Sequence, residues 1–187
     1  MKNNVMVSKQ IIIYLVVLVL VIIGAYYFIG FGSSQPKDDP NAPKPPAGYD
    51  IPQGSIHWHP RLKIIIKGEV FHIQDNIGIG NSATDSSIGS DMGAAPIHTH
   101  DLAEDPAEET ENGRRLHMES LNPQLKPSTL SLWYFFKVWG KTFNSTCIFD
   151  KCNGPNGQVK MFVNDKPNTD FNKYFMHDGD RILIVYE

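Results

Sequence analysis

The chain has 187 residues, of which 41% are hydrophobic and 20% charged, with 15 Gly, 13 Pro and two Cys. Residues 56–187 carry 13 Lys and Arg against 17 Asp and Glu, so this part of the chain lacks the basic face that binding to phosphates requires. We therefore expect no nucleic-acid partner. Two cysteines also exclude a four-thiolate zinc or iron–sulfur site made by this chain alone.

The first feature along the chain is an apolar stretch at residues 11–32, which contains no charged or amide side chain. A helix of this length, at about 1.5 Å per residue, reaches roughly 33 Å and matches the core of a bilayer. Positive charges lie at Lys2 and Lys9, and none follows before Lys37. The pattern predicts a transmembrane anchor in contact with the lipid bilayer, with residues 1–10 in the cytoplasm.

The predicted anchor determines the expected location of the rest of the chain. The alternative is a cleaved signal peptide, whose apolar region is normally shorter, about 7–15 residues. We favour the uncleaved anchor, and either interpretation exports the following residues. The prediction is a single-pass protein of the cell membrane with an extracytoplasmic C-terminal domain, for which another membrane protein is a possible partner.

Two further segments complete the predicted organisation. Residues 33–55 are dense in proline and small polar residues, which is typical of an extended linker. Residues 56–187 are long enough for one compact domain with a hydrophobic core. Because that domain is expected outside the cytoplasm, Cys147 and Cys152 are predicted to form a small disulfide loop.

The hydrophobic pattern of residues 56–187 predicts an α+β domain. Residues 61–67 and 69–74 alternate around Gly68, which indicates a β-hairpin. A helix is expected from Ser128 or Thr129 as its cap to Gly140, with a stripe of apolar residues at helical spacing. Residues 158–163 and 181–186 are predicted as strands, and a turn is expected at residues 177–180.

These elements resemble a known fold family. The segments "LKIIIKGEVFHI" and "VKMFVNDKP…MHDGDRILIVY" are similar to small sulfur-carrier proteins, which have the β-grasp (ubiquitin-like) fold. The resemblance implies a mixed sheet with one main helix, into which a long histidine-bearing connection is inserted. Carriers of that kind end in a reactive Gly-Gly, whereas this chain ends in Val185, Tyr186 and Glu187, so carrier chemistry is not implied.

Five of the seven histidines lie in three short pairs. These pairs are His57-Trp58-His59, His98-Thr99-His100-Asp101 and His117-Met118-Glu119. Residues two apart on a strand point the same way, so each pair can direct both side chains to one point. Imidazole and carboxylate groups are ligands of divalent transition metals, copper and zinc among them.

The predicted topology brings the three pairs together. The first pair precedes the first strand of the hairpin, and the connection that carries the other two leaves from the neighbouring end of the second strand. We therefore predict a Cu²⁺ or Zn²⁺ site in which His57, His59, His98 and His100 rank first, then His117. Glu119 and Asp101 are expected to be a ligand, a base or a group that hydrogen-bonds a ligand.

The remaining histidines and nearby residues have simpler interpretations. We expect His72 and His177 to be ordinary hydrogen-bonded residues, and Met118 to face the core because it alternates with its neighbours. His98, His100 and Glu104 also match the first motif of the cupins, but the second cupin motif is not evident. Taken together, the histidine pairs and the segment "SLWYFFKVWG" resemble a group of uncharacterised exported prokaryotic proteins.

Three functions are compatible with this pattern. The favoured hypothesis is a membrane-anchored extracytoplasmic protein that handles copper or zinc or serves a membrane complex. The first alternative is a metal-dependent enzyme, cupin-like or hydrolytic, with Glu119 or Asp101 as the general base. The second alternative is an interaction module whose histidines only form hydrogen bonds.

Overall fold

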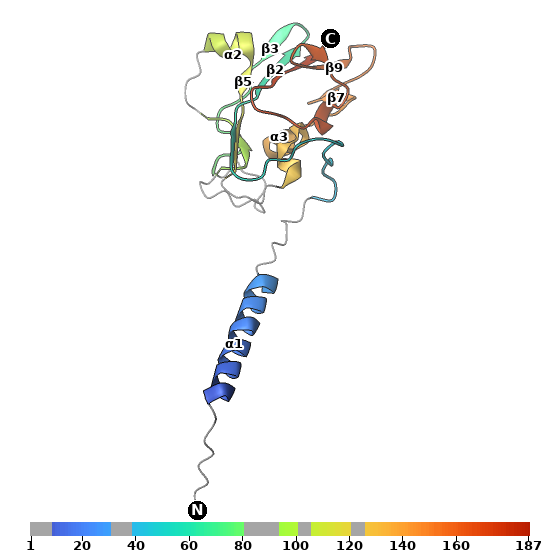
Figure 1. Ribbon diagram of the computed structural model, residues 1–187. Coiled ribbons are helices and arrows are strands. Elements are labelled where there is room, and N and C mark those ends of the chain that lie inside the picture. The colour runs from blue at the N-terminus through green and yellow to red at the C-terminus, as the bar shows by residue number, and fades with distance from the viewer. Residues whose placement is uncertain (1–8, 31–38, 81–93, 101–105, 121–125) are drawn as a thin grey trace, which may run out of the picture. The chain divides into compact units, whose positions relative to one another are not determined.

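A computed structural model describes residues 9–30, 39–80, 94–100, 106–120 and 126–187 of the chain (Figure 1). The side chains described in the first helix are those of residues 10–24. The chain divides into two compact units, Met1–Gln35 and Pro36–Glu187. The candidate site and the hydrophobic core both belong to the second unit.

The first unit contains one helix, α1 (Lys9–Gly30). Among the described residues, no helix combines the length and the apolar character that crossing a bilayer requires. The predicted transmembrane anchor at residues 11–32 is therefore contradicted, and so is the predicted single-pass location in a cell membrane.

The second unit is built around a six-stranded mixed sheet. The strands β10, β9, β11, β2 and β3 lie side by side in this order, and β5 pairs with β2. β2 and β11 are parallel, whereas the other pairs are antiparallel. The bounds of these strands are β2 (Arg61–Ile66), β3 (Glu69–Phe71), β5 (Arg114–Arg115), β9 (Val159–Val163), β10 (Lys166–Pro167) and β11 (Arg181–Tyr186).

The predicted hairpin is confirmed as β2 and β3, with the turn at Lys67 and Gly68. Both turn residues have positive φ, which suits the right-handed twist of a two-residue hairpin. Leu62 and Ile64 alternate into the core and are fully buried. The second strand is shorter than expected, because β3 ends at Phe71 and the chain then leaves the sheet.

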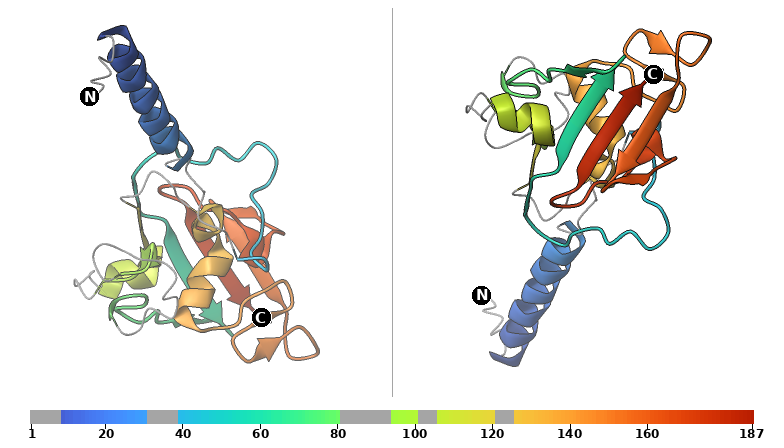
Figure 2. Two further views of the ribbon diagram at one scale, coloured as in Figure 1. Left: turned by 90° about the horizontal axis from the view of Figure 1, so that it is seen from below. Right: turned by 90° about the horizontal axis from the view of Figure 1, so that it is seen from above.

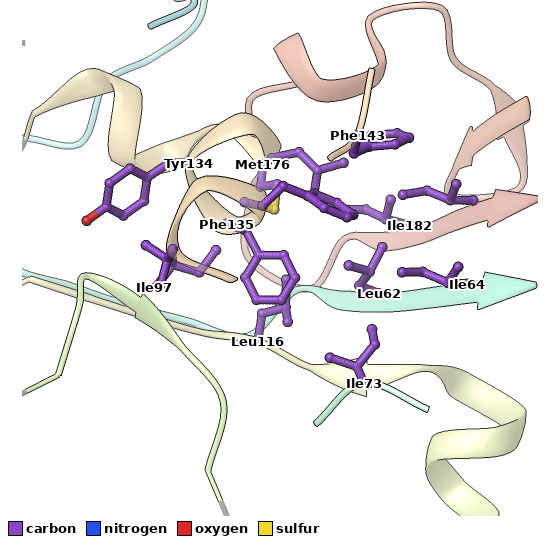
Figure 3. Packing of buried hydrophobic residues seen from close by; sticks show 14 of the residues in the cluster. Leu62, Ile64, Ile73, Ile97, Leu116, Tyr134, Phe135, Phe143, Met176 and Ile182 are labelled. Atoms are coloured by element: carbon purple, nitrogen blue, oxygen red, sulfur yellow. The ribbon is translucent and has the colours of Figure 1, made fainter. Parts of the chain in front are cut away.

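The main helix, α3 (Leu132–Trp139), covers one face of this sheet (Figure 2). Its predicted apolar stripe is confirmed, and Phe135 packs between the helix and the strands close to Leu62 and Leu116 (Figure 3). Gly140 ends the helix with φ 67°, as predicted. The predicted cap is wrong: a 3₁₀ turn, η2 (Pro127–Leu130), comes first, and the Ser131 side chain caps the helix.

A separate three-stranded sheet lies beside the first. Its strands are β1 (Ile56–Trp58), β6 (His117–Ser120) and β4 (Ile97–His98), with β6 in the centre and both pairs antiparallel. A short helix, α2 (Pro106–Asn112), precedes β5 and packs against β2. This second sheet was not predicted, and it carries the histidine pairs.

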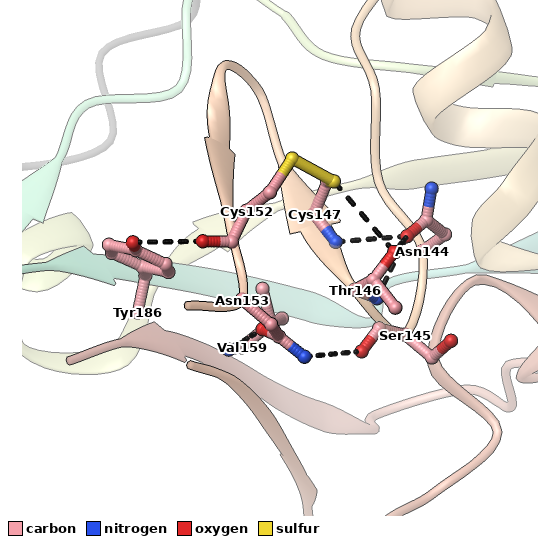
Figure 4. The surroundings of a disulfide bond; sticks show 8 residues. All are labelled: Asn144, Ser145, Thr146, Cys147, Cys152, Asn153, Val159 and Tyr186. Carbon is pink, nitrogen blue, oxygen red and sulfur yellow. Dashed lines mark hydrogen bonds between the residues drawn. A yellow bond between two sulfur atoms is a disulfide. The ribbon is translucent and has the colours of Figure 1, made fainter. Parts of the chain in front are cut away.

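The predicted disulfide between Cys147 and Cys152 is present and closes a small hairpin, β7 (Cys147–Ile148) and β8 (Lys151–Cys152) (Figure 4). The Asn144 side chain accepts hydrogen bonds from the backbone N–H groups of Thr146 and Cys147. The Tyr186 hydroxyl donates to the carbonyl of Cys152 at 3.1 Å and ties the hairpin to β11. Neither cysteine is therefore a free thiolate.

The predicted linker, residues 33–55, contacts the domain in its described part. Tyr49 packs on Phe175, with ring centroids 5.2 Å apart, and its hydroxyl donates to the carbonyl of Met176 at 2.6 Å. Asp39 forms an ion pair with Lys137 of α3 at 2.8 Å. These contacts join the segment to the second compact unit.

The predicted fold class is wrong in its transmembrane helix, because no described helix is long and apolar enough to cross a bilayer. The second unit is α+β, with one main helix and several sheets, one of them mixed. The central parallel pair, β2 and β11, is flanked by an antiparallel neighbour on each side. The resemblance to the β-grasp sulfur carriers stays a prediction.

Candidate metal centre

The three-stranded sheet sets the positions of the histidines. His117 on β6 lies opposite His98 on β4, and Glu119 lies opposite His57 on β1. Directly opposed residues of antiparallel strands, and residues two apart on one strand, point to the same face. His59 and His100 follow the strands two residues after their partners. The register alone therefore directs one carboxylate and several imidazoles to one face of the sheet.

The other face of this sheet belongs to the hydrophobic core. Met118 lies opposite Trp58 and Ile97 in the register, and both Met118 and Ile97 are fully buried. Because side chains alternate along a strand, burying these apolar residues turns the adjacent histidines away from the core. The prediction that Met118 packs in the core is confirmed.

His98 is the most deeply buried histidine, with an exposed fraction of 3%. Its Nδ1 lies 2.9 Å from the carbonyl oxygen of Ala95, which can only accept, so Nδ1 carries the proton. Burial lowers the pKa of His98, which keeps the ring neutral. Its Nε2 then presents a lone pair, which accepts a hydrogen bond from the Nε2 of His100 at 3.1 Å.

His117 occupies the middle of the cluster. Its ring centroid lies 4.2 Å from that of His100 and 4.8 Å from that of His59. The Nδ1 atom is buried and has no hydrogen-bond partner among the described residues; the Glu119 carboxylate is 3.7 Å away, beyond hydrogen-bonding distance. Burial, reinforced by the surrounding imidazoles, lowers the pKa of His117 to about 3. A neutral imidazole whose nitrogen makes no hydrogen bond can coordinate a metal ion through that nitrogen.

The outer part of the cluster is open to solvent. The His57 side chain is 62% exposed, and its Nε2 donates to Glu119 Oε1 at 3.0 Å. The rings of His57 and His59 lie 4.5 Å apart. Burial, and then the neighbouring His57, lower the pKa of His59. The backbone N–H of His59 donates to Asp178 at 2.7 Å, which fixes this end of β1.

The donor atoms form two sets, each of which could hold a metal ion. Within each set the donor atoms all lie within 4.8 Å of one another. The first set is His98, His100, His117 and Glu119, and the second is His57, His59 and His117. Six of the seven predicted site residues are thus brought together, whereas Asp101 lies outside the described residues, as does Glu104 of the cupin-like motif.

Arg114 supports the site but was not predicted. It is 5% exposed, and its guanidinium donates to the backbone carbonyl of His100 and to Asp75. The carboxylate of Glu109 lies 3.5 Å from the same group. A buried arginine that binds a backbone carbonyl beside a histidine holds that segment in place. No local sequence pattern marks this role, because the partners are distant in the chain.

The two histidines outside the pairs behave as expected. His72 contacts Glu109 at 3.1 Å, and its side chain is 68% exposed. His177 contacts Asp180 at 3.5 Å in the predicted turn, where Gly179 has φ 74°. Among the described residues, neither histidine belongs to a set of donor atoms that could hold a metal.

Comparisons with protein-family profiles, with curated proteins and with solved structures found no match. The function is therefore argued from the chemistry of the site.

Proposed function

We propose that this protein binds a divalent transition metal ion, copper or zinc, at the histidine cluster and that its function is to handle that metal. The observation that carries the proposal is the buried Nδ1 of His117, which has no hydrogen-bond partner among the described residues although four other imidazoles surround the ring. Leaving a buried polar atom unsatisfied costs about 1–3 kcal/mol. Metal coordination at that nitrogen removes the cost.

The donor set indicates which metals fit. Five imidazoles and one carboxylate favour Zn²⁺ or Cu²⁺ over Mg²⁺ and Ca²⁺, which prefer oxygen ligands. Both cysteines are held in the disulfide, so a thiolate site for Cu⁺ is not supported. The neutral state of His98 and His117 also favours binding, since no proton has to leave their rings before a cation approaches.

The hydrogen bond from His98 to Ala95 supports the same assignment. Metal-binding histidines usually donate the second ring N–H to a carbonyl or carboxylate, which orients the ring and fixes the tautomer. His98 makes this contact through Nδ1 and keeps Nε2 for the cluster. Without a metal, gathering five imidazoles, of which His117 has an unpaired buried nitrogen, has no evident structural benefit.

A metal-dependent hydrolase is the second candidate, because of the position of Glu119. Its carboxylate lies 3.7 Å from the central His117 nitrogen and is 30% exposed, so it can reach both a bound ion and solvent. A carboxylate in this position can act as a general base towards a metal-bound water. Metal handling is preferred because the cluster offers more ligands than a catalytic ion with an open position requires.

The test is metal analysis of the full chain, purified without a histidine tag and stripped with a chelator. Calorimetric titration with Zn²⁺ and with Cu²⁺ should show binding tighter than micromolar for at least one of them. Replacing the central ligand, as in His117→Leu, should weaken this binding more than 100-fold, whereas His72→Gln should leave it unchanged. Failure of the wild-type chain to bind either ion would overturn the proposal.

A further inference from the structure

The donor atoms of the cluster form two sets that share His117 as their common member. The outer set adds His57 and His59, and the inner set adds His98, His100 and Glu119. Ligands of one zinc ion lie about 2.0–2.2 Å from the metal, and a closed site normally takes four of them. One ion therefore cannot use all six side chains at once, and two alternative positions for it lie side by side.

The two sets differ in their access to solvent. His57, in the outer set, is 62% exposed, whereas His98, in the inner set, is 3% exposed. An ion arriving from water meets the outer set first. The inner set offers four donors, one of them a carboxylate, in a drier environment where electrostatic attraction is stronger. The inner position should consequently hold the ion more tightly.

The inner set is also closed by its own hydrogen bond. The Nε2–H of His100 donates to the lone pair of His98 Nε2 at 3.1 Å. Neither nitrogen can therefore bind a cation until this hydrogen bond is broken. Glu119 is likewise engaged, because it accepts from His57 at 3.0 Å. An ion that binds the Nε2 of His57 breaks this second hydrogen bond and releases the carboxylate for the inner set.

We propose that the cluster is a two-position transfer path, in which the ion first binds His57, His59 and His117 and then moves to the inner set. This inference rests on the proposed function. His117 stays bound during the move, while the two outer imidazoles leave and the inner donors replace them. The charge of the ion does not change, and wherever it binds Nε2 of His57 or His100, the ring proton moves to Nδ1 through solvent.

The test is the rate of metal loading, measured by stopped-flow absorbance when Cu²⁺ is mixed with the metal-free full chain. The wild type should show a fast phase followed by a slower one, with one tightly bound ion at equilibrium. His57→Gln should slow loading about tenfold or more and change the equilibrium affinity less than threefold. His98→Gln should keep the fast phase and lose the tightly bound ion.

His72→Gln is the matched control, because His72 is as exposed as His57 and also contacts a glutamate. It should leave both phases unchanged. The path is overturned if His57→Gln lowers the equilibrium affinity as strongly as His98→Gln, if it leaves the loading rate unchanged, or if two ions bind tightly. Those results leave metal binding intact, whereas no binding by the wild type overturns the proposed function itself. Circular dichroism of each variant checks folding.

Discussion

Two polar clusters lie close together in this domain, and they differ in whether their buried polar atoms have hydrogen-bond partners. The first is the histidine cluster described above. The second surrounds Asp180, which is 6% exposed and accepts hydrogen bonds from the Asn164 amide, the Tyr174 hydroxyl and the backbone N–H of His177. The turn at residues 177–180 connects them, since Asp178 holds the backbone of His59.

This difference indicates that one cluster has a structural role and the other a role in binding a ligand. The carboxylate of Asp180 is satisfied by groups of the protein, so the fold itself explains why a charge is buried there. His117 is surrounded by four other imidazole rings, and its Nδ1 lacks a hydrogen bond within the described part of the chain. A fold that needed only stability would not gather imidazoles in this way. The cluster around Asp180 should therefore govern stability, and the histidine cluster should govern ligand binding.

The largest expected effect concerns the shared ligand. His117→Leu should weaken binding of Zn²⁺ or Cu²⁺ more than 100-fold, beyond the roughly 10–100-fold cost of altering a group that only supports a ligand. The metal-free variant should be as stable as the wild type or more stable, because an unsatisfied buried nitrogen is removed. Calorimetric titration and urea unfolding measure the two effects. A large loss of metal-free stability would contradict the comparison.

The opposite result is expected at the second cluster. Asp180→Ala leaves three donors without their acceptor and should lower the free energy of unfolding by about 2–3 kcal/mol. The metal affinity of the folded variant should stay within a few fold of the wild type. Urea unfolding of the metal-free chain provides the first measurement and metal titration the second. Loss of metal binding in a folded variant would show that the clusters are not independent.

A smaller effect is expected at Arg114, which holds the backbone at His100. Arg114→Lys keeps the positive charge but loses the planar group that reaches several acceptors at once. Metal affinity should fall about tenfold, in the range for groups that support a ligand. Lys63→Arg, whose wild-type amine donates to the carbonyl of Glu111 at 3.0 Å, is the control and should bind metal normally. Equal affinities of the two variants would exclude the positioning role.

The smallest effects concern pH, and the two clusters should respond in opposite directions. In the metal-free chain, burial lowers the pKa of His117 to about 3. Between about pH 6.5 and pH 3 this residue is therefore protonated in the unfolded chain but not in the folded chain. The free energy of unfolding consequently falls as the pH drops through this range. Burial, together with Asp180, raises the pKa of Tyr49 and Tyr174 above the ordinary value of 10. Their contribution is complete below that value and is lost as pH rises above it.

Urea unfolding between pH 4 and pH 11 checks both slopes. Each group contributes at most about 1.4 kcal/mol per pH unit, and partial exposure to solvent reduces this to several tenths. His117→Leu should flatten the acidic slope and Tyr49→Phe the alkaline slope. An unchanged acidic slope in the first variant would mean that His117 is protonated normally in the folded chain.

Local patterns in the sequence account for much of the fold. The hairpin of β2 and β3, the strands β9 and β11, and the apolar stripe of α3 follow from residues that are close together in the chain. The cap at Ser131 was missed because the 3₁₀ turn ahead of α3 satisfies the same start signals. The transmembrane prediction rested on the apolar composition of residues 11–32 alone and was wrong, since none of the described helices is long and apolar enough to cross a bilayer.

The residues of the histidine cluster could be predicted from the sequence, but the sheet that brings them together could not. Spacing of two residues identified the pairs, since each pair points one way on a strand. The sheet formed by β1, β6 and β4 was not foreseen, because its strands are two to four residues long and β1 pairs with β6 across about sixty residues of sequence. Arg114 was missed for the same reason, as its partners Asp75 and His100 are remote in the chain.

The central claim is that His117 is a metal ligand shared by the two sets of donors. A crystal of the full chain grown with one equivalent of Zn²⁺, with diffraction recorded at the zinc absorption edge, tests it most directly. The account predicts one strong anomalous peak about 2.0–2.1 Å from a ring nitrogen of His117. A bound zinc ion elsewhere, or no peak within coordination distance of this ring, would contradict it.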